Sequence, residues 1–239
     1  MVNYDFTSAS RLGDLGRWFV NGFVREVGRE EPAGSLILDA GAGEAVYRKY
    51  FSRCRYESVD LAVGDEEWNY NELDYVAPLD DLPMANERYD AVLCTQVLEH
   101  LERPRESVCE FHRVLKPGGR LYLTAPMAHV EHQVPFDFFR YTSFGLRSIV
   151  AEAGFEEIEI APFGGMFTRW AYELPRALAI FPPLRSPSGR IQFSGLCLLP
   201  AKLFALILVR VCQAVLLLLE PFDKVKNDPF GWSLRAVRK

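Results

Sequence analysis

The segment Leu36–Gly43 constrains the fold of this chain more than any other stretch. Its sequence, LILDAGAG, is an apolar run that ends in an acid and passes at once into a glycine loop. The apolar residues predict a strand buried on both faces. Gly41 and Gly43 let the backbone turn tightly and approach a ligand before a helix that we expect to begin near Glu44. The segment therefore indicates a nucleotide-type cofactor site at the carboxyl end of a strand.

A second acid and the spacing of the glycine loop narrow the class of cofactor. Asp60 ends the apolar stretch 56–61, 19 residues after Gly41, where a carboxylate at the tip of the second strand reaches ribose hydroxyls. A dinucleotide fingerprint requires a small residue where this chain has Val46, and the charge of Asp39 would repel a pyrophosphate. That charge suits a ligand with an ammonium and a sulfonium, such as S-adenosylmethionine.

From this point on the chain resembles the class I S-adenosylmethionine-dependent methyltransferases. Asp39–Gly43 matches the family's first motif, with Ala45 in the place of a frequent third glycine, and Asp60 matches its ribose-binding acid. The later motifs lie at 82–84, 89–94, 97–101 and 113–119, so the resemblance covers roughly residues 36–126. The fixed order of these motifs makes the match more specific than any one of them.

The resemblance implies a Rossmann-like α/β fold, with a mostly parallel sheet of seven strands of which the last is antiparallel, and S-adenosylmethionine as the cofactor. The acid that the family often has four residues before Leu82 is Pro78 here, so we expect the adenine contact from Leu79, Asp80 or backbone groups. The cofactor-binding residues implied are Asp39, Ala40, Gly41, Gly43, Asp60, Leu61, Leu79, Asp80, Thr95 and Gln96.

Hydrophobic periodicity predicts alternating strands and helices along the chain. Pro117-Gly118-Gly119 predicts a tight turn, and Thr142 or Ser143 is expected to cap a helix that Gly154 ends. Helices are predicted at about 10–27, 44–52, 104–115 and 142–153. Strands are predicted at 36–39, 56–61, 74–77, 89–94, 120–125, 155–160 and 232–237.

More than sixty residues separate the last two predicted strands, which indicates an insertion. We expect a methyltransferase domain of residues 1–163 plus 229–239 and a helical, apolar insertion of residues 164–228. The centre of the insertion, residues 203–219, approaches the length of a membrane span, but Arg210 lies near its middle. Three interpretations remain open for it: a buried packing helix, a helix at a membrane surface or a partner, and a true span.

The acceptor side of the site is expected in the segment 128–142. This segment resembles one found in methyltransferases of bacterial cell-surface polysaccharide or glycan synthesis, with His132, Asp137 and Arg140 in the recurrent pattern. Transfer of a methyl group to a hydroxyl benefits from a base, so His132 is predicted as the base and Asp137 as a second catalytic residue. The aromatic faces of Phe136 and Phe138 are expected to stack on a sugar or a lipid carrier.

Each of these residues also has a structural interpretation. Asp137 and Arg140 could form only a local ion pair that shapes the loop, and His132 could anchor the loop by hydrogen bonds. Glu99 and His100 are expected to open a helix and to orient the loop over the cofactor.

Composition limits the partners and the location of the protein. The net charge of −5 without a basic run argues against a nucleic-acid substrate. Five cysteines without a Cys-x-x-Cys pair indicate reduced thiols and a cytoplasmic setting, and no histidine has zinc-ligand spacing to a cysteine, so no metal is expected. Residues 1–10 lack the apolar core of a signal peptide.

These observations favour S-adenosylmethionine-dependent O-methylation of a sugar or a lipid-linked glycan. A lipid or another small molecule is the nearer alternative acceptor. A catalytically silent cofactor-binding scaffold, recruited to the membrane through residues 203–219, is the alternative from another class, and a nicotinamide oxidoreductase is disfavoured by Val46 and Asp39.

Overall fold

The computed structural model describes residues 14–64, 68–186 and 189–239, which form two compact units. Within the described residues, the first unit comprises 19–163 and 231–239, and the second comprises 14–18 and 164–230. The first unit holds the sheet and the second holds the helices between the last two strands.

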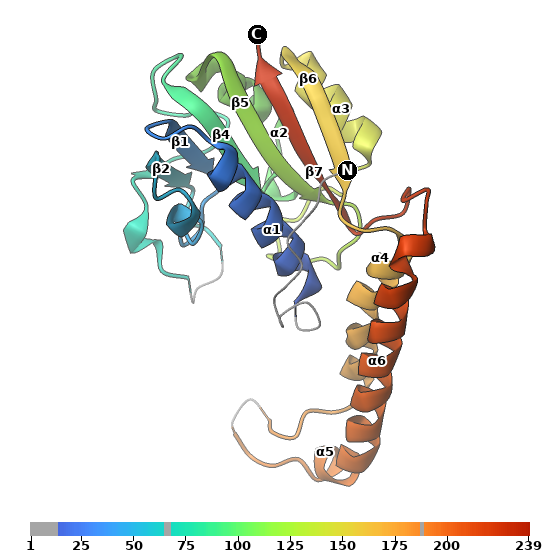
Figure 1. Ribbon diagram of the computed structural model, residues 1–239. Coiled ribbons are helices and arrows are strands. Elements are labelled where there is room, and N and C mark those ends of the chain that lie inside the picture. The colour runs from blue at the N-terminus through green and yellow to red at the C-terminus, as the bar shows by residue number, and fades with distance from the viewer. Residues whose placement is uncertain (1–13, 65–67, 187–188) are drawn as a thin grey trace. The chain divides into compact units, whose positions relative to one another are not determined.

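A seven-stranded sheet with the order β3-β2-β1-β4-β5-β7-β6 forms the centre of the first unit (Figure 1). All neighbouring pairs are parallel except those of β7, which lies antiparallel between β5 and β6. The predicted fold class is therefore confirmed, including the late antiparallel strand. The strands are β1 (Leu36–Ala40), β2 (Arg55–Asp60), β3 (Tyr75–Val76), β4 (Tyr89–Thr95), β5 (Leu115–Pro126), β6 (Phe155–Pro162) and β7 (Gly231–Arg238).

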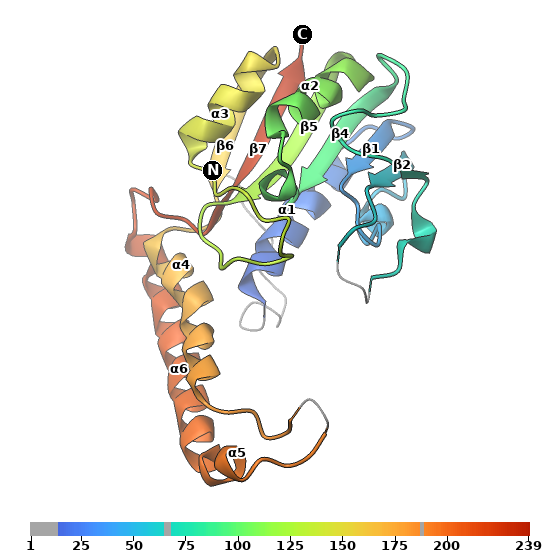
Figure 2. The same cartoon turned by 180° about the vertical axis from the view of Figure 1, so that it is seen from behind.

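Helices cover both faces of this sheet, as βαβ connections require. Figures 1 and 2 show α1 (Leu15–Glu30) on one face and α2 (Pro104–Val114) and α3 (Ser143–Glu152) on the other. The Thr142 hydroxyl caps α3 by accepting a hydrogen bond from Gly145 N at 3.1 Å, and Gly154 follows its end with φ +97°. These are the predicted cap and terminator.

Three local predictions need correction. No α-helix follows the glycine loop at 44–52: Ala45 is left-handed with φ +54°, which interrupts an α-helix, and only the 3-10 turn η2 (Arg48–Tyr50) forms. Residues 117–119 lie within β5, where Lys116–Gly119 bulges out of the ladder with β4, and Gly118 takes φ +75°. Glu99 and His100 lie in the 3-10 turn η4 (Leu98–His100), and α2 begins later, at Pro104. The predicted helix start at residues 10–13 lies outside the described residues.

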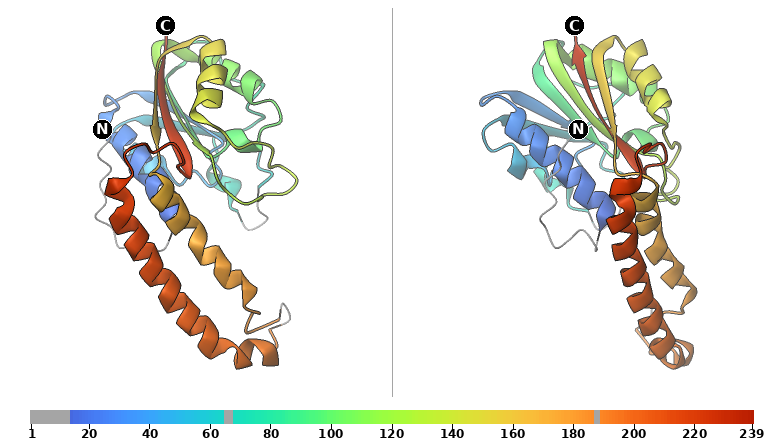
Figure 3. Two further views of the ribbon diagram at one scale, coloured as in Figure 1. Left: turned by 90° about the vertical axis from the view of Figure 1, so that its right-hand side faces the viewer. Right: turned by 45° about the vertical axis from the view of Figure 1, so that its right-hand side comes forward.

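The second unit is a helical hairpin. α4 (Met166–Glu173) continues into the 3-10 segment η5 (Leu174–Ile180) and packs antiparallel to the long α6 (Leu199–Leu219), as Figure 3 shows. The short α5 (Phe193–Cys197) joins the two arms, and η6 (Glu220–Phe222) follows α6.

A buried carboxylate fixes the end of α1 to the sheet. The side chain of Glu31 is 1% exposed and accepts hydrogen bonds from Arg120 Nε at 2.7 Å, Arg120 Nη2 at 2.9 Å and the Tyr122 hydroxyl at 2.7 Å. The bidentate pair compensates the cost of removing the carboxylate from water. Glu31 thereby joins the helix to the middle of β5.

We expect Glu31→Ala to lower the free energy of unfolding by about 2–4 kcal/mol, because it leaves Arg120 and Tyr122 without their partner in a largely buried place. Glu152→Ala, which breaks an exposed pair with Arg105, is the matched control and should cost less than about 1 kcal/mol. Urea unfolding measures both. Equal costs for the two variants would contradict the role assigned to Glu31.

Candidate active site

The loops after β1 and β2 are joined by one carboxylate at the carboxyl edge of the sheet. Asp60, at the end of β2, accepts hydrogen bonds from Gly43 N at 2.9 Å and from Ala62 N at 2.8 Å. Each carboxylate oxygen has a further lone pair, so the group can hold the glycine loop and still accept from a ligand hydroxyl. The structure thus brings the glycine loop and Asp60, which the sequence predicts separately, into direct contact.

The glycine loop lies directly against the segment that follows β4. A Cβ placed on Gly41, which has φ +79°, would come within 2.4 Å of Val97 Cγ2. Gly43 also has a positive φ, and a Cβ there would lie 3.1 Å from the ring of Trp68. Only glycine meets both the backbone angle and the close approach at residue 41. The cradle of Gly41, Gly43 and Asp60 fits the ribose and the amino-acid part of S-adenosylmethionine in residue type and place.

Three of the seven described non-glycine residues with positive φ lie at the same edge. Ala45, Ala62 and Gln96 have φ +54°, +58° and +55° and lie in the loops after β1, β2 and β4. Such backbone conformations cost free energy and persist where the surroundings impose them, most often at functional sites. No sequence signal marks them, because the three side chains are ordinary.

Asp39 lies inside the fold and not at its surface. Its carboxylate is 0% exposed and accepts a hydrogen bond from the Tyr56 hydroxyl, while Oδ1 has no partner among the described residues. Burial raises the pKa of Asp39 to about 7, and the Tyr56 hydrogen bond opposes that shift. The sequence predicts that the charge of Asp39 attracts the cationic cofactor. At neutral pH, however, this carboxyl group is only partly ionised.

Three of the other predicted cofactor residues are buried. Ala40 and Thr95 are the last residues of their strands, and Leu79 belongs to the hydrophobic core. Their side chains have little surface to offer a ligand, so contact with a cofactor would come from their backbone groups.

The remaining predicted residues have accessible or tethered side chains. Leu61 is 47% exposed and directly follows β2, and Asp80 forms an ion pair with Arg103. Gln96 donates from Nε2 to the Thr124 hydroxyl at 3.1 Å, which fixes its side chain toward β5.

The turn after β4 connects the cofactor loop to the acceptor loop. Val97 packs on Gly41, and the Tyr141 hydroxyl donates to Leu98 O at 2.8 Å. Glu99 O accepts hydrogen bonds at 2.8 and 3.2 Å from the backbone amides of residues 138 and 139. One short turn thus positions both halves of the candidate site.

Asp137 organises the acceptor loop. It forms a bidentate pair with Arg140, at 2.6 and 2.8 Å, and accepts a hydrogen bond from His132 N at 2.9 Å. His132 Nδ1 lies 3.3 Å from Asp137 Oδ2 and 3.1 Å from Val130 O. The Arg140 hydrogen bonds hold the pKa of Asp137 well below its usual range. Asp137 is therefore a charged carboxylate beside His132 at neutral pH.

The histidines of the site are neutral at physiological pH. Burial lowers the pKa of His132 below its ordinary value, and His100 lowers it further. Burial also lowers the pKa of His100, whose Nδ1 lies 2.5 Å from Phe136 O. Contacts of Nδ1 with carbonyl oxygens assign the proton to that atom in both rings, which leaves Nε2 with a lone pair. Neutral imidazoles of this kind can accept a proton.

Glu99 joins these two histidines in a cluster that sequence spacing does not suggest. Ligand atoms of Glu99, His100 and His132 lie within 4.8 Å of one another, and the rings of His100 and His132 meet edge to face at 4.6 Å. Glu99 is 1% exposed, burial raises its pKa to about 8, and its Oε2 has no partner among the described residues. Two imidazoles and one carboxylate are a donor set that can hold a divalent transition metal.

Comparison with known proteins identifies the domain that holds the glycine loop. Residues 38–123 match the family model described as a methyltransferase domain. Ubiquinone biosynthesis O-methyltransferase of Ruegeria pomeroyi is 33% identical over 120 residues, which are 46% of this chain and 48% of that protein. Malonyl-acyl-carrier-protein O-methyltransferase of Hahella chejuensis is 31% identical over 136 residues, which are 50% of this chain and 47% of that protein. The chain thus spans about half the length of these curated relatives.

Solved structures share the fold at low sequence identity. A phosphoethanolamine N-methyltransferase of Haemonchus contortus, solved with S-adenosylmethionine, has a TM-score of 0.54 and 17% identity, with 100% of this chain and 60% of that chain covered. The [4+2]-cyclase SpnF has a TM-score of 0.57 and 18% identity, covering 92% of this chain and 79% of that chain. Since a protein described as a cyclase shares the fold, the fold alone does not fix the reaction.

We expect Asp39→Asn to become more stable relative to the natural protein as the pH rises. The folded pKa of Asp39 is raised from 3.8 to about 7, so the stability that it contributes is complete below pH 3.8 and is lost as the pH rises through 7. Between about pH 5 and 8 the difference in the free energy of unfolding should move by about 2–4 kcal/mol in favour of the variant, measured by urea unfolding. A difference that stays constant with pH would contradict the raised pKa.

Proposed function

We propose that this protein, whose residues 38–123 match the methyltransferase-domain family model, is a class I S-adenosylmethionine-dependent methyltransferase that transfers a methyl group to a hydroxyl oxygen of its acceptor. When bound, S-adenosylmethionine supplies the methyl group on a sulfonium. The chain has to hold that cofactor, bring the acceptor oxygen into line and accept a proton from it. The curated relatives described above are O-methyltransferases by name, which supports oxygen as the acceptor atom.

Binding of the cofactor is assigned to the carboxyl edge of β1, β2 and β4. Asp60 would bind the ribose hydroxyls, and the turn from Gly41 to Gly43 would let the backbone approach the amino-acid part. Leu79, Asp80 or backbone groups remain the predicted adenine contacts, and Leu61 remains a predicted cofactor contact. Among these three, Leu61 has the exposed surface that such a contact needs.

The observation that carries the proposal is the neutral His132, held by the charged Asp137 on a loop that the turn after β4 fixes in place. Nδ1 carries the proton toward Val130 O and Asp137, so Nε2 is the atom that would accept the hydroxyl proton. Asp137 would stabilise the imidazolium that results. Asp137 thus acts through His132 as a positioning residue, whereas the sequence predicted both as catalytic residues.

For the acceptor, we propose a sugar hydroxyl, on a free or a lipid-linked glycan. The side chains of Phe136, Phe138 and Phe139 are 38–40% exposed on the loop that carries His132. Exposed aromatic faces beside polar groups suit the apolar faces of a sugar ring. The resemblance of residues 128–142 to polysaccharide methyltransferases supports the same acceptor class.

A lipid or another small molecule is the second candidate acceptor. It is favoured by the names of several relatives, which are ubiquinone biosynthesis O-methyltransferases. Incubating the purified protein with S-adenosylmethionine labelled in its methyl group and with fractionated cell extract separates the candidates. Label in a glycan supports the first, label in an apolar small molecule supports the second, and a protein that binds the cofactor without transferring label would be a scaffold.

Asp60→Ala should weaken the binding of S-adenosylmethionine by about 10- to 100-fold, because charge-assisted hydrogen bonds to the ribose are each worth about 1.5–3 kcal/mol. Isothermal titration calorimetry measures the change, with the exposed Asp81→Ala as the matched control. The natural protein should bind S-adenosylhomocysteine and should not bind NAD. Binding of NAD without the sulfonium cofactor would contradict the assignment.

His132→Ala should lower the rate of methyl transfer by about 10²- to 10⁴-fold and leave cofactor affinity near that of the natural protein. His129→Ala, on the same loop, is the matched control and should change the rate far less. The rate of the natural protein should fall only below pH 6.5, the ordinary histidine value, because the pKa of His132 is lowered. Activity that a chelator abolishes and a divalent metal restores would show instead that the cluster of Glu99, His100 and His132 holds a metal.

A further inference from the structure

The long helix α6 has an apolar surface that its own unit leaves uncovered. Among the described residues, one helical stretch, Leu199–Phe222, is long and apolar enough to cross a membrane by length and composition. Within α6 only Val209 and Gln213 are buried. A large exposed apolar surface of this kind marks a site of contact with a protein or a membrane. The exposed large apolar side chains of α6 are Leu203, Phe204, Leu206, Ile207, Leu208, Val211, Val215, Leu218 and Leu219.

Beyond α4, the charges of the hairpin all have one sign. Residues 174–219 contain five basic residues, Arg176, Arg185, Arg190, Lys202 and Arg210, and no acidic residue. The chain as a whole carries a net charge of −5. Arg210 is fixed to α6 itself by a hydrogen bond from Nη1 to Gln213 Oε1 at 2.9 Å. An apolar surface with only positive charges complements a bilayer that contains anionic lipids.

Three acidic residues follow α6 at the base of the hairpin, where the arms meet the strands in sequence: Glu220, Asp223 and Asp228. Glu220 is buried and accepts hydrogen bonds from Thr168 N at 2.9 Å and Lys226 Nζ at 3.0 Å. Asp223 accepts from Met166 N at 2.8 Å. The base of the hairpin is therefore polar, with its acids hydrogen-bonded, whereas residues 174–219 are apolar and basic. On a membrane, this separation would keep the polar base in water and turn residues 174–219 toward the bilayer.

The connections of the hairpin exclude a simple passage through a bilayer. Its two ends continue from β6 and into β7, which are neighbours in one sheet, and Phe163 N donates to Gly231 O at 2.8 Å where they meet. An arm that entered a membrane must return on the same side. α6, with 21 residues at about 1.5 Å per residue, matches the hydrocarbon core, but α4 and η5 together run only from Met166 to Ile180. Arg210 in the middle of α6 further disfavours a span.

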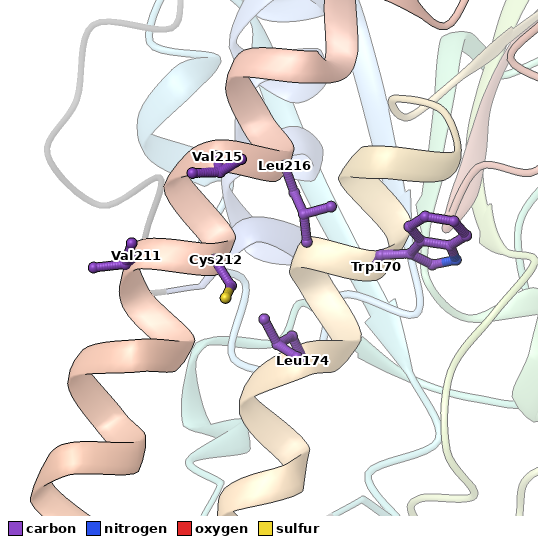
Figure 4. A pocket seen from close by; sticks show the side chains of 6 residues that line it. All are labelled: Trp170, Leu174, Val211, Cys212, Val215 and Leu216. Atoms are coloured by element: carbon purple, nitrogen blue, oxygen red, sulfur yellow. The ribbon is translucent and has the colours of Figure 1, made fainter.

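The two arms also leave an apolar cleft between them. It has a volume of about 540 Å³ and is lined by Trp170, Leu174, Val211, Cys212, Val215 and Leu216, shown in Figure 4. None of these six lining residues is charged. The buried Gln213 side chain donates to Ala171 O at 2.7 Å and ties the arms together. Acyl chains suit a cleft of this composition.

We propose that the hairpin of residues 174–219 docks on a membrane that contains anionic lipids and inserts its apolar side chains into one leaflet. Arg185, Arg190 and Lys202 bind headgroup phosphates, and the exposed side chains of α5 and α6 enter the acyl region. Docking would raise the local concentration of a lipid-linked acceptor around the domain to which the hairpin is covalently joined. The benefit for a lipid-linked acceptor rests on the proposed function, whereas the docking itself does not depend on it.

Flotation of the full chain with vesicles tests the docking. The protein should float with vesicles of phosphatidylcholine and phosphatidylglycerol and bind pure phosphatidylcholine far less. Arg185→Gln with Arg190→Gln and Lys202→Gln should lower the partition coefficient about 100-fold, at about fivefold for each basic residue. Arg29→Gln with Arg55→Gln and Arg147→Gln, three exposed residues of the first unit, are the matched control and should leave it unchanged. Equal binding of both triple variants would overturn the role of the basic residues.

A second pair of variants tests the apolar insertion. Phe193→Gln with Phe204→Gln, at positions 80% and 70% exposed, should lower vesicle binding at least about 10-fold, and Phe144→Gln with Val76→Gln, also exposed, should not. The melting shift caused by S-adenosylhomocysteine should be the same in all variants, so loss of docking is read separately from loss of the cofactor site. A natural protein that ignores vesicles, or one that instead self-associates through Phe193 and Phe204, would overturn the proposal.

Discussion

The close approach of the glycine loop to the turn after β4 is the contact on which the rest of the site depends. Val97 fills the space that a side chain at Gly41 would need, and the residues that follow Val97 hold the acceptor loop by backbone hydrogen bonds. A shift of about 1 Å in this turn would move the cofactor loop and the loop of His132 together, enough to disturb an in-line transfer. The geometry of the site is therefore set by main-chain packing, and its side chains add charge and proton affinity.

The carboxyl groups with shielded side chains divide into two kinds. Glu31 and Asp137 have arginine partners at hydrogen-bond distance, so their charge is compensated. Among the described residues, Asp39 and Glu99 each keep one carboxyl oxygen without a hydrogen bond, and burial raises the pKa of both. Unpaired carboxyl groups in a fold cost stability, and their presence at the edge where a cationic cofactor would lie is consistent with a ligand that completes their environment.

The helical hairpin separates its polar and apolar parts along its length. Acids and their partners close its base, while the charged residues beyond α4 are all basic and lie among apolar ones. The chain enters the hairpin from β6 and leaves it into β7, and these two strands are neighbours in one sheet. The sheet order brings the two ends together, because β7 is inserted antiparallel between β5 and β6.

The order of strands and helices, the glycine loop and the acid at the end of β2 follow from the sequence, because periodicity and strand-end chemistry are local. The absence of a helix after the glycine loop does not follow from the sequence, because it depends on the left-handed Ala45. The bulge at Lys116–Gly119 does not follow from the sequence either. The ion pair of Asp137 with Arg140 lies within one loop, so the spacing of these residues suggests it. The meeting of His100 with His132, and of Val97 with Gly41, was decided only by the tertiary structure, because parallel strands far apart in the chain end at one edge.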